Sequence, residues 1–205
     1  MLCFCVAISG AGYLAAIACQ STVWKYLLKP GTMVLILLIA LSKAGEAGSY
    51  GWLIVLGLLF SIIGDIFLML PSDRFVAGLT SFFLAHVVYI LAFPAKWTFD
   101  ALSVITGLIL GGIALIYFML IRSGVRAEGG TLLQIAVVLY ITVISLMVYR
   151  AAFSGEISVL VGAVSFYLSD AILAWNRFVK RDPRGEYAVM ITYFLAQTCI
   201  AVSVW

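Results

Sequence analysis

The amino-acid sequence predicts an all-α, polytopic membrane protein with eight transmembrane helices, and its composition and apolar runs lead to that prediction. Hydrophobic residues make up 65% of the 205 residues and charged residues only 10%, whereas soluble domains have about 45–50% apolar and about 25% charged residues. The mean hydropathy is +1.19. Because so little charge cannot solvate the surface of a soluble domain, this composition excludes a soluble globular protein, a disordered tail and a nucleic-acid binder.

Apolar runs of helical length, bounded by charges, proline and glycine, divide the chain into eight segments. They cover residues 2–20, 31–44, 51–70, 75–93, 101–121, 131–149, 157–176 and 187–205. A membrane-crossing helix needs about 20 apolar residues, and none of the runs alternates with the period of two of a β-barrel strand. Since proline is favoured at a helix start, we expect the short second helix to begin at residue 31, after Pro30. Short loops join the runs into one membrane domain, residues 1–205, and pairs such as Gly111 and Gly112 indicate close helix packing.

The basic residues predict the orientation of the helices. The loops after the first, third, fifth and seventh runs contain nine Lys and Arg residues, and the opposite loops contain three. The nine are Lys25, Lys29, Arg74, Arg122, Arg126, Arg177, Lys180, Arg181 and Arg184, and the three are Lys43, Lys96 and Arg150. Because cytoplasmic loops are enriched in Lys and Arg, we expect a multi-pass protein of the cell (inner) membrane with both termini on the non-cytoplasmic side. Aromatic residues suited to anchoring on that side are Tyr50, Trp52, Trp97, Tyr149 and Trp205.

Two of the runs resemble each other. Residues 64–68 (GDIFL) are followed by RFV at 74–76, and residues 169–173 (SDAIL) are followed by RFV at 177–179. This similarity would relate the third and seventh helices and divide the protein into two parallel four-helix repeats. A match this short also arises by chance, so both interpretations stay open.

Two carboxylates, Asp65 and Asp170, lie inside the predicted spans, whereas the other seven acidic residues fall in loops or at span ends. At ~1.5 Å per residue, both lie roughly 8–10 Å below the cytoplasmic edge and share one depth. A carboxylate in hydrocarbon costs several kcal/mol unless it is paired, solvated or protonated. We therefore expect a common polar cavity that opens to the cytoplasmic side. The alternative is that each carboxylate pairs with a nearby cation, such as Arg177.

Five further polar residues fall near this level: Lys29, His86, Asn176, Tyr193 and Gln197. Lys29 marks the mouth of the second span, and Tyr193 and Gln197 lie one turn apart on the same helix face. Because a lone intramembrane histidine most often makes an interhelical hydrogen bond, His86 is either a site member or a structural contact. The four cysteines lie in apolar runs without metal-binding spacing, so we expect no metal and no cofactor.

These residues lie in motifs that resemble a known family. Residues 64–71 (GDIFLMLP), Phe75, residues 78–79 and residues 85–89 (AHVVY) are similar to the central signature of the YhhN-like lysoplasmalogenase family. Residues 168–174 (LSDAILA) with 176–178 (NRF) resemble its second signature, and residues 29–30 (KP) and 193–197 (YFLAQ) resemble its flanking motifs. The resemblance covers residues 25 to 200. It implies hydrolysis of the vinyl ether bond of lysoplasmalogens to a fatty aldehyde and glycerophosphoethanolamine or glycerophosphocholine, with a lysophospholipid substrate drawn from membrane lipids.

Two carboxyl groups suit that chemistry. A vinyl ether is cleaved by protonation of its β-carbon, which leaves an oxocarbenium ion that water attacks; glycoside hydrolysis meets a similar cation with a carboxyl pair. We expect Asp65 and Asp170 to be this acid–base pair, without an assignment of which is the acid. Lys29 could hold the lipid phosphate as a point charge, and Tyr193, Gln197 and Asn176 could position water or the glycerol hydroxyl.

Two other classes of function fit a pair of intramembrane acids. A proton-coupled transporter could use them as a proton relay. A non-catalytic lipid-binding membrane protein would tolerate apolar replacements of both, as many buried charges do. The sequence sets no oligomeric state.

Overall fold

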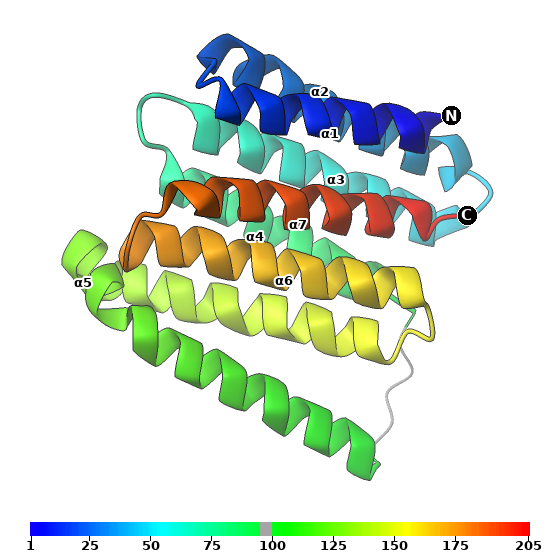
Figure 1. The fold of residues 1–205 in the computed structure, drawn as a ribbon. Helices are drawn as coiled ribbons and strands as arrows, with labels where there is room; N and C mark the ends of the chain where they lie inside the picture. Colours follow the sequence, from blue (N-terminus) through cyan, green and yellow to red (C-terminus); the bar gives the residue numbers. More distant parts are fainter. Residues whose placement is uncertain (95–99) are drawn as a thin grey trace.

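The computed structural model describes residues 1–94 and 100–205, and within them the chain forms seven α-helices and no strand (Figure 1). The helices are α1 (Leu2–Ala18), α2 (Thr22–Ala44), α3 (Gly48–Met69), α4 (Phe75–Ala92), α5 (Ala101–Ala152), α6 (Ile157–Phe178) and α7 (Pro183–Val202). Six of them are long and apolar enough to cross a membrane, and α1, with 17 residues, is shorter. The all-α membrane prediction is confirmed at this level. Lys96 and Trp97 lie outside the described residues.

Helix α5 contains two of the predicted runs, 101–121 and 131–149. Its 52 residues are interrupted where Gly129 (φ −141°, ψ 18°) and Gly130 (φ 62°, ψ −154°) leave helical geometry, and glycine adopts a positive φ at little cost. The chain folds back there, so α5 has a first arm, residues 101–128, and a second arm, residues 131–152 (Figure 1). With α5 counted as one element, the described residues form six candidate spans, and the count of eight and the internal repeat stay predictions.

The expected start of the second helix at residue 31 is wrong. Helix α2 begins at Thr22, and Pro30 lies inside it. Proline removes one helical hydrogen bond, but neighbouring helices and hydroxyl groups can stabilise the interrupted turn in a membrane protein. Here Thr32 Oγ1 donates to the Leu28 carbonyl at 2.7 Å and lies 2.7 Å from Ser9 Oγ of α1. These contacts outweigh the local preference of proline for a helix start.

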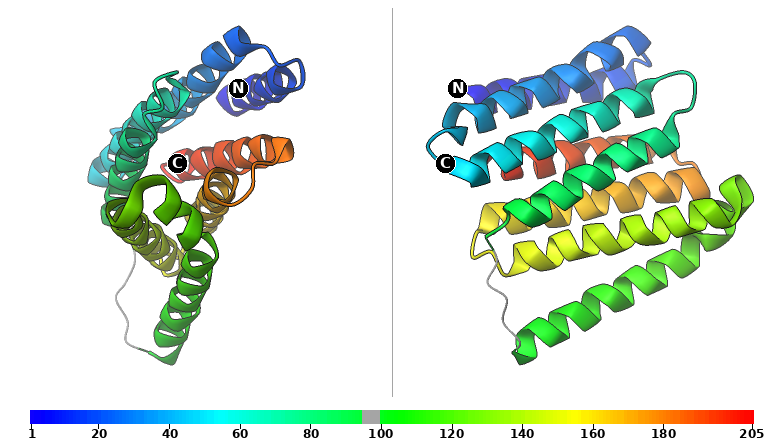
Figure 2. Two further views of the ribbon diagram at one scale, coloured as in Figure 1. Left: turned by 90° about the vertical axis from the view of Figure 1, so that its left-hand side faces the viewer. Right: turned by 180° about the vertical axis from the view of Figure 1, so that it is seen from behind.

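The helices run side by side in a curved bundle, and the first arm of α5 lies at its edge (Figures 1 and 2). Helix α7 packs against α1, α2, α3 and α6. Both termini lie at one end of the bundle, and the turns after α1, α3 and α6 lie at the other end with the α5 kink (Figure 1). Seven of the nine grouped Lys and Arg residues lie in these turns or within four residues of them, whereas Lys29 and Arg122 lie inside α2 and α5.

Candidate functional site

Asp65 of α3 is enclosed by side chains from two other helices. It is 1% exposed. Lys29 Nζ of α2 lies 2.9 Å from Oδ1, and the Tyr193 hydroxyl of α7 donates to Oδ2 at 2.6 Å. Both carboxylate oxygens therefore have a donor, which a buried charge requires. The pairing joins α2, α3 and α7 inside the bundle.

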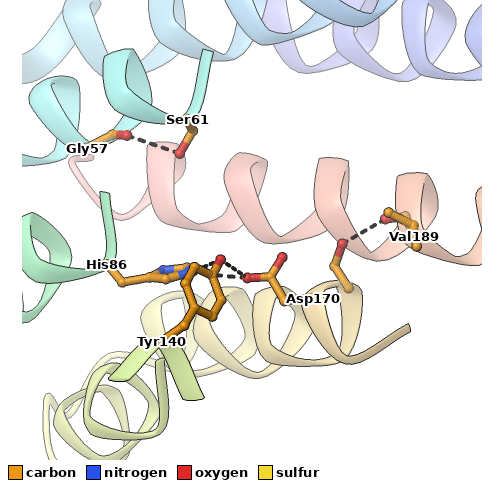
Figure 3. Close-up of polar contacts among 7 residues, drawn as sticks. Gly57, Ser61, His86, Tyr140, Asp170 and Val189 are labelled. Atoms are coloured by element: carbon orange, nitrogen blue, oxygen red, sulfur yellow. Dashed lines mark hydrogen bonds and ion pairs between the residues drawn. The ribbon is translucent and has the colours of Figure 1, made fainter. Parts of the chain in front are cut away.

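Asp170 of α6 has a different set of partners (Figure 3). The Tyr140 hydroxyl donates to Oδ2, and His86 Nε2 lies 3.2 Å from the same oxygen and 3.0 Å from the Tyr140 hydroxyl. Because the single hydroxyl proton of Tyr140 is given to Asp170, His86 must carry its proton on Nε2 to donate to this pair. His86 Nδ1 is buried and has no hydrogen-bond partner among the described residues.

The second oxygen of Asp170 is free. No described side chain or backbone group donates to Oδ1, and the Asp170 side chain is 13% exposed. Tyr140 lies on the second arm of α5 and His86 on α4, so side chains from two helices hold one oxygen of a residue that also lines an apolar cavity.

The expectation of one common polar cavity for both aspartates is wrong. Asp65 and Asp170 belong to separate hydrogen-bonded groups, and no hydrogen bond joins the two carboxylates in the described part of the chain. The Phe166 ring lies between the groups, with its centroid 4.6 Å from the His86 ring and 5.5 Å from the Tyr193 ring. Depth along a helix was predictable from its rise, but rotation about the helix axis turned the two carboxylates toward different neighbours.

A charged cavity of about 980 Å³, here called the vestibule, opens at the kink end of the bundle. The charged and amide residues that line it are Lys25, Lys29, Asp73, Arg74, Asn176, Arg177, Arg181, Asp182 and Glu186. Lys29 lines the vestibule and Asp65 does not, so Asp65 lies behind the Lys29 ammonium group.

A small apolar cavity of about 50 Å³ lies next to Asp170 and is called the Asp170 cavity. Its walls come from α3, α4, α5 and α6, and the polar residues that line it are Tyr117, Tyr140, Tyr167 and Asp170. Leu68, Phe75 and Leu173 line both this cavity and the vestibule. These three side chains therefore form the boundary between a polar entrance and an apolar chamber that holds a carboxyl group.

An ion cluster closes the rim of the vestibule. Arg177 contacts Asp73 of the α3–α4 turn at 2.8 Å through Nη2 and Glu128 of the first α5 arm at 2.8 Å through Nε. The Arg177 guanidinium holds the pKa of Asp73 below its usual value. Arg177 is thus paired at the surface and not with Asp170, so the expected alternative of a pairing with a nearby cation is wrong for Asp170. It is confirmed for Asp65, which pairs with Lys29.

The remaining predicted residues take other positions. Asn176 Oδ1 accepts a bond from the Asp182 backbone at 3.3 Å and shapes the α6–α7 turn beside the vestibule. Gln197 is fully buried, and its Oε1 accepts from the Tyr89 hydroxyl at 2.9 Å. Neither contacts a carboxylate of the two groups. Among the described residues, no three His, Cys, Asp or Glu side chains gather closely enough to ligate a metal ion.

Sequence reasoning missed Tyr140. A tyrosine in the middle of an otherwise aliphatic run was the available signal, because a buried hydroxyl usually has a hydrogen-bond partner. The structure therefore brings Lys29 and Tyr193 to Asp65, and His86 and Tyr140 to Asp170.

Comparisons with known proteins match nearly the whole chain. Residues 24–204 match the model of the YhhN family. Lysoplasmalogenase TMEM86B of Sus scrofa is 33% identical over 173 residues, which cover 83% of this chain and 71% of that protein. Human lysoplasmalogenase TMEM86A is 29% identical, covering 73% and 64%, and the uncharacterized membrane protein YhhN of Escherichia coli O157:H7 is 24% identical, covering 88% and 87%. No solved structure matches.

Proposed function

This chain belongs to the YhhN family, and on that premise we propose that it is a lysoplasmalogenase, a membrane hydrolase that cleaves the vinyl ether bond of lysoplasmalogens. Relatives from pig and rat that are named lysoplasmalogenases share 33% and 31% identity with it, each over 83% of this chain. The observation that carries the proposal is Asp170, a carboxyl group with one oxygen fixed by two donors and the other free beside an apolar cavity.

The reaction adds water across an alkenyl ether. A proton adds to the β-carbon, and the resulting oxocarbenium ion is attacked by water at the α-carbon. The hemiacetal then collapses, its hydroxyl proton passes to the leaving oxygen, and the products are a fatty aldehyde and a glycerophospho-alcohol. Carbon protonation requires a positioned acid, and the cation requires a nearby negative charge in a site of low dielectric constant.

We assign Asp170 as the acid. In this role the proton to be transferred would be on Oδ1, because the contacts with Tyr140 and His86 are both made to Oδ2. After transfer, the same two donors stabilise the carboxylate that remains, because hydrogen bonds to a charged acceptor are stronger than those to a neutral one. The carboxylate then faces the cation that its own proton created.

We propose Asp65 as the final acceptor of the water proton; because its carboxylate lines neither cavity, the proton would reach it through Lys29, which lines the vestibule and contacts Asp65. Lys29 contacts one of its oxygens and Tyr193 donates to the other. Lys29 also lines the vestibule, so a phosphate bound there competes with Asp65 for the ammonium group. Return of the water proton to Asp170 completes the cycle with no net change in the protein.

The vestibule suits a zwitterionic head group. Its lining includes cations that can meet a phosphate, such as Lys29 and Arg181, and carboxylates that can meet an ammonium group, such as Asp182 and Glu186. Phosphoethanolamine and phosphocholine carry both charges. The apolar Asp170 cavity suits the alkenyl end of the same molecule.

We also propose that the protein crosses the inner membrane eight times, with each arm of α5 and α1 counted as a crossing and both termini non-cytoplasmic. The shared end of the termini and the basic residues at the other end support this topology. Labelling of an engineered terminal cysteine by an impermeant reagent in intact cells tests it, and labelling only after lysis would contradict it.

The decisive experiment compares an alkenyl lysolipid with its saturated ether analogue, using purified protein and measuring aldehyde. We expect aldehyde from the alkenyl lipid alone, and loss of at least about 100-fold in Asp170→Asn and Asp65→Asn. Asp100→Asn, at the exposed start of α5 and able to keep the Ser103 cap, is the matched control. Proton-coupled uptake without hydrolysis would favour a transporter, and full activity of the Asp170 variant would remove the assignment.

A further inference from the structure

An apolar groove of about 450 Å³ lies between the two arms of α5. Gly107, Gly111 and Phe118 line it from the first arm, and Val138 and Leu146 line it from the second. None of the described residues that line it is charged. Away from the kink, the first arm diverges from the rest of the bundle (Figure 1), so the groove is bounded by protein on one side and reaches the lipid-facing edge on the other.

The groove adjoins the Asp170 cavity. Ile141 lines both, and the neighbouring residues Tyr117 and Phe118 line the cavity and the groove respectively. From Gly107 to Phe118 the first arm covers about 16 Å at ~1.5 Å per residue. That length is close to half of the ~30 Å hydrocarbon thickness of a bilayer, which is the depth that one lipid chain occupies.

The glycines of the first arm keep this groove open. The sequence predicted close helix packing at Gly111 and Gly112, and that prediction is wrong, because a β-carbon at either position would meet no atom within 4 Å. At Gly107 it would meet only Tyr149, at 3.8 Å. Gly57 of α3 shows the contrast, since a β-carbon there would overlap the Tyr89 ring. Of the first-arm glycines, Gly107 and Gly111 line the groove, and a β-carbon at either would not overlap another atom of the described protein.

We propose that the groove between the arms of α5 binds the alkenyl chain of the lysolipid, an inference that rests on the proposed function. The head group occupies the vestibule, and the glycerol passes Leu68, Phe75 and Leu173 at the boundary of the two cavities. The vinyl ether then lies beside Asp170, and the chain continues past Ile141 into the groove. Polar entrance, acid and apolar groove follow one another in the same order as phosphate, vinyl ether and hydrocarbon chain in the substrate.

A matched pair of variants tests the groove. Gly111→Phe fills it, whereas Gly112→Phe adds the same side chain one residue away, at a glycine that does not line it. Turnover of hexadecenyl and octenyl lysolipids is measured for each. We expect the ratio of kcat/KM for the long chain over the short chain to fall about tenfold in Gly111→Phe, the loss expected from excluding about two methylenes from an apolar site. The ratio stays at the wild-type value in Gly112→Phe. Equal ratios in both variants would overturn the inference.

A second measurement does not depend on turnover. A saturated ether lysophospholipid with a terminal photoreactive group is cross-linked to the wild-type protein, and the labelled peptides are identified. We expect labelling concentrated on residues 107–118 and 138–149. Labelling spread evenly over the lipid-facing helices, as bulk lipid would give, would overturn the inference. A wild-type protein that hydrolyses neither alkenyl lipid but is labelled in the groove would instead contradict the proposed reaction and leave the chain-binding site standing.

Discussion

Replacing Tyr140 with phenylalanine tests whether Asp170 acts as a positioned acid. Tyr140 is 7% exposed, its hydroxyl donates to Asp170 Oδ2, and its ring meets the His86 ring edge-on with centroids 5.3 Å apart. Phenylalanine keeps the ring and removes only the oxygen. The variant therefore removes one donor from the carboxyl group and leaves the surrounding packing in place.

The expected loss follows from the strength of that hydrogen bond. A hydrogen bond to a charged group contributes about 1.5–3 kcal/mol. Once Asp170 has given up its proton, its carboxylate lacks this stabilisation in the variant, so the barrier rises and kcat falls about 10- to 150-fold. His86 Nε2, 3.2 Å from the same oxygen, stays as a donor and keeps the loss from being complete.

The assay is aldehyde release from an alkenyl lysolipid at saturating concentration, with thermal unfolding in detergent as a check of the fold. Tyr117→Phe is the matched control, because Tyr117 lines the same cavity but donates to the Ala171 carbonyl, at 2.5 Å. We expect the control to keep kcat within about threefold of the wild type. Equal losses in the two variants, or full activity of Tyr140→Phe, would refute the role given to this hydroxyl.

Two further predictions concern the charges around the vestibule. Lys29→Met leaves Asp65 buried without its cation, and we expect the free energy of unfolding to fall by about 3–5 kcal/mol. Adding Asp65→Asn should restore much of that loss, as measured by thermal unfolding. If the double variant is no more stable than Lys29→Met, the pairing is contradicted. The Arg177 guanidinium lowers the pKa of Asp73, so their contact stabilises the rim at pH values above the ordinary Asp pKa of about 3.9 and is lost as the pH falls through the lowered pKa. The protection of the α3–α4 turn against hydrogen exchange, relative to the intrinsic rate at each pH, should therefore fall only below about pH 4, and in Asp73→Asn it should be low at neutral pH as well.

The sequence predicted those site residues that are charged or strongly polar in segments that must be apolar to cross a membrane. Asp65 and Lys29 are charges in an apolar chain, and each must find a partner inside a membrane protein. His86 was selected for the same reason, because it is a polar residue in an apolar run. Tyr140 does not stand out in this way, since tyrosine is common in cores. Only the fold shows that its hydroxyl meets a carboxylate.

Helix boundaries were predictable where the length and hydropathy of a run determine them. They were less predictable where tertiary contacts determine them. A break between 121 and 131 was predicted from two helix-length runs separated by charge and glycine, and the kink at Gly129 and Gly130 lies in that interval, although the first arm stays helical beyond residue 121. The predicted start of α2 was wrong, because it rested on the preference of proline for the first turn of a helix. That preference takes no account of the contacts that Thr32 makes with α1 and Lys29 makes with α3.

The separation of the two aspartates makes Lys29 the link between binding and chemistry in the proposed reaction. Its ammonium group lies 2.9 Å from Asp65 and Lys29 also lines the vestibule, so it lies between the carboxylate that we propose as the base and the cavity that we propose for the head group. In the proposed reaction, a phosphate in the vestibule would compete with Asp65 for the ammonium group and so act on this carboxylate alone. Two carboxylates in one cavity would have had to divide a proton between them, whereas Lys29 contacts Asp65 and not the hydrogen-bonded group of Asp170.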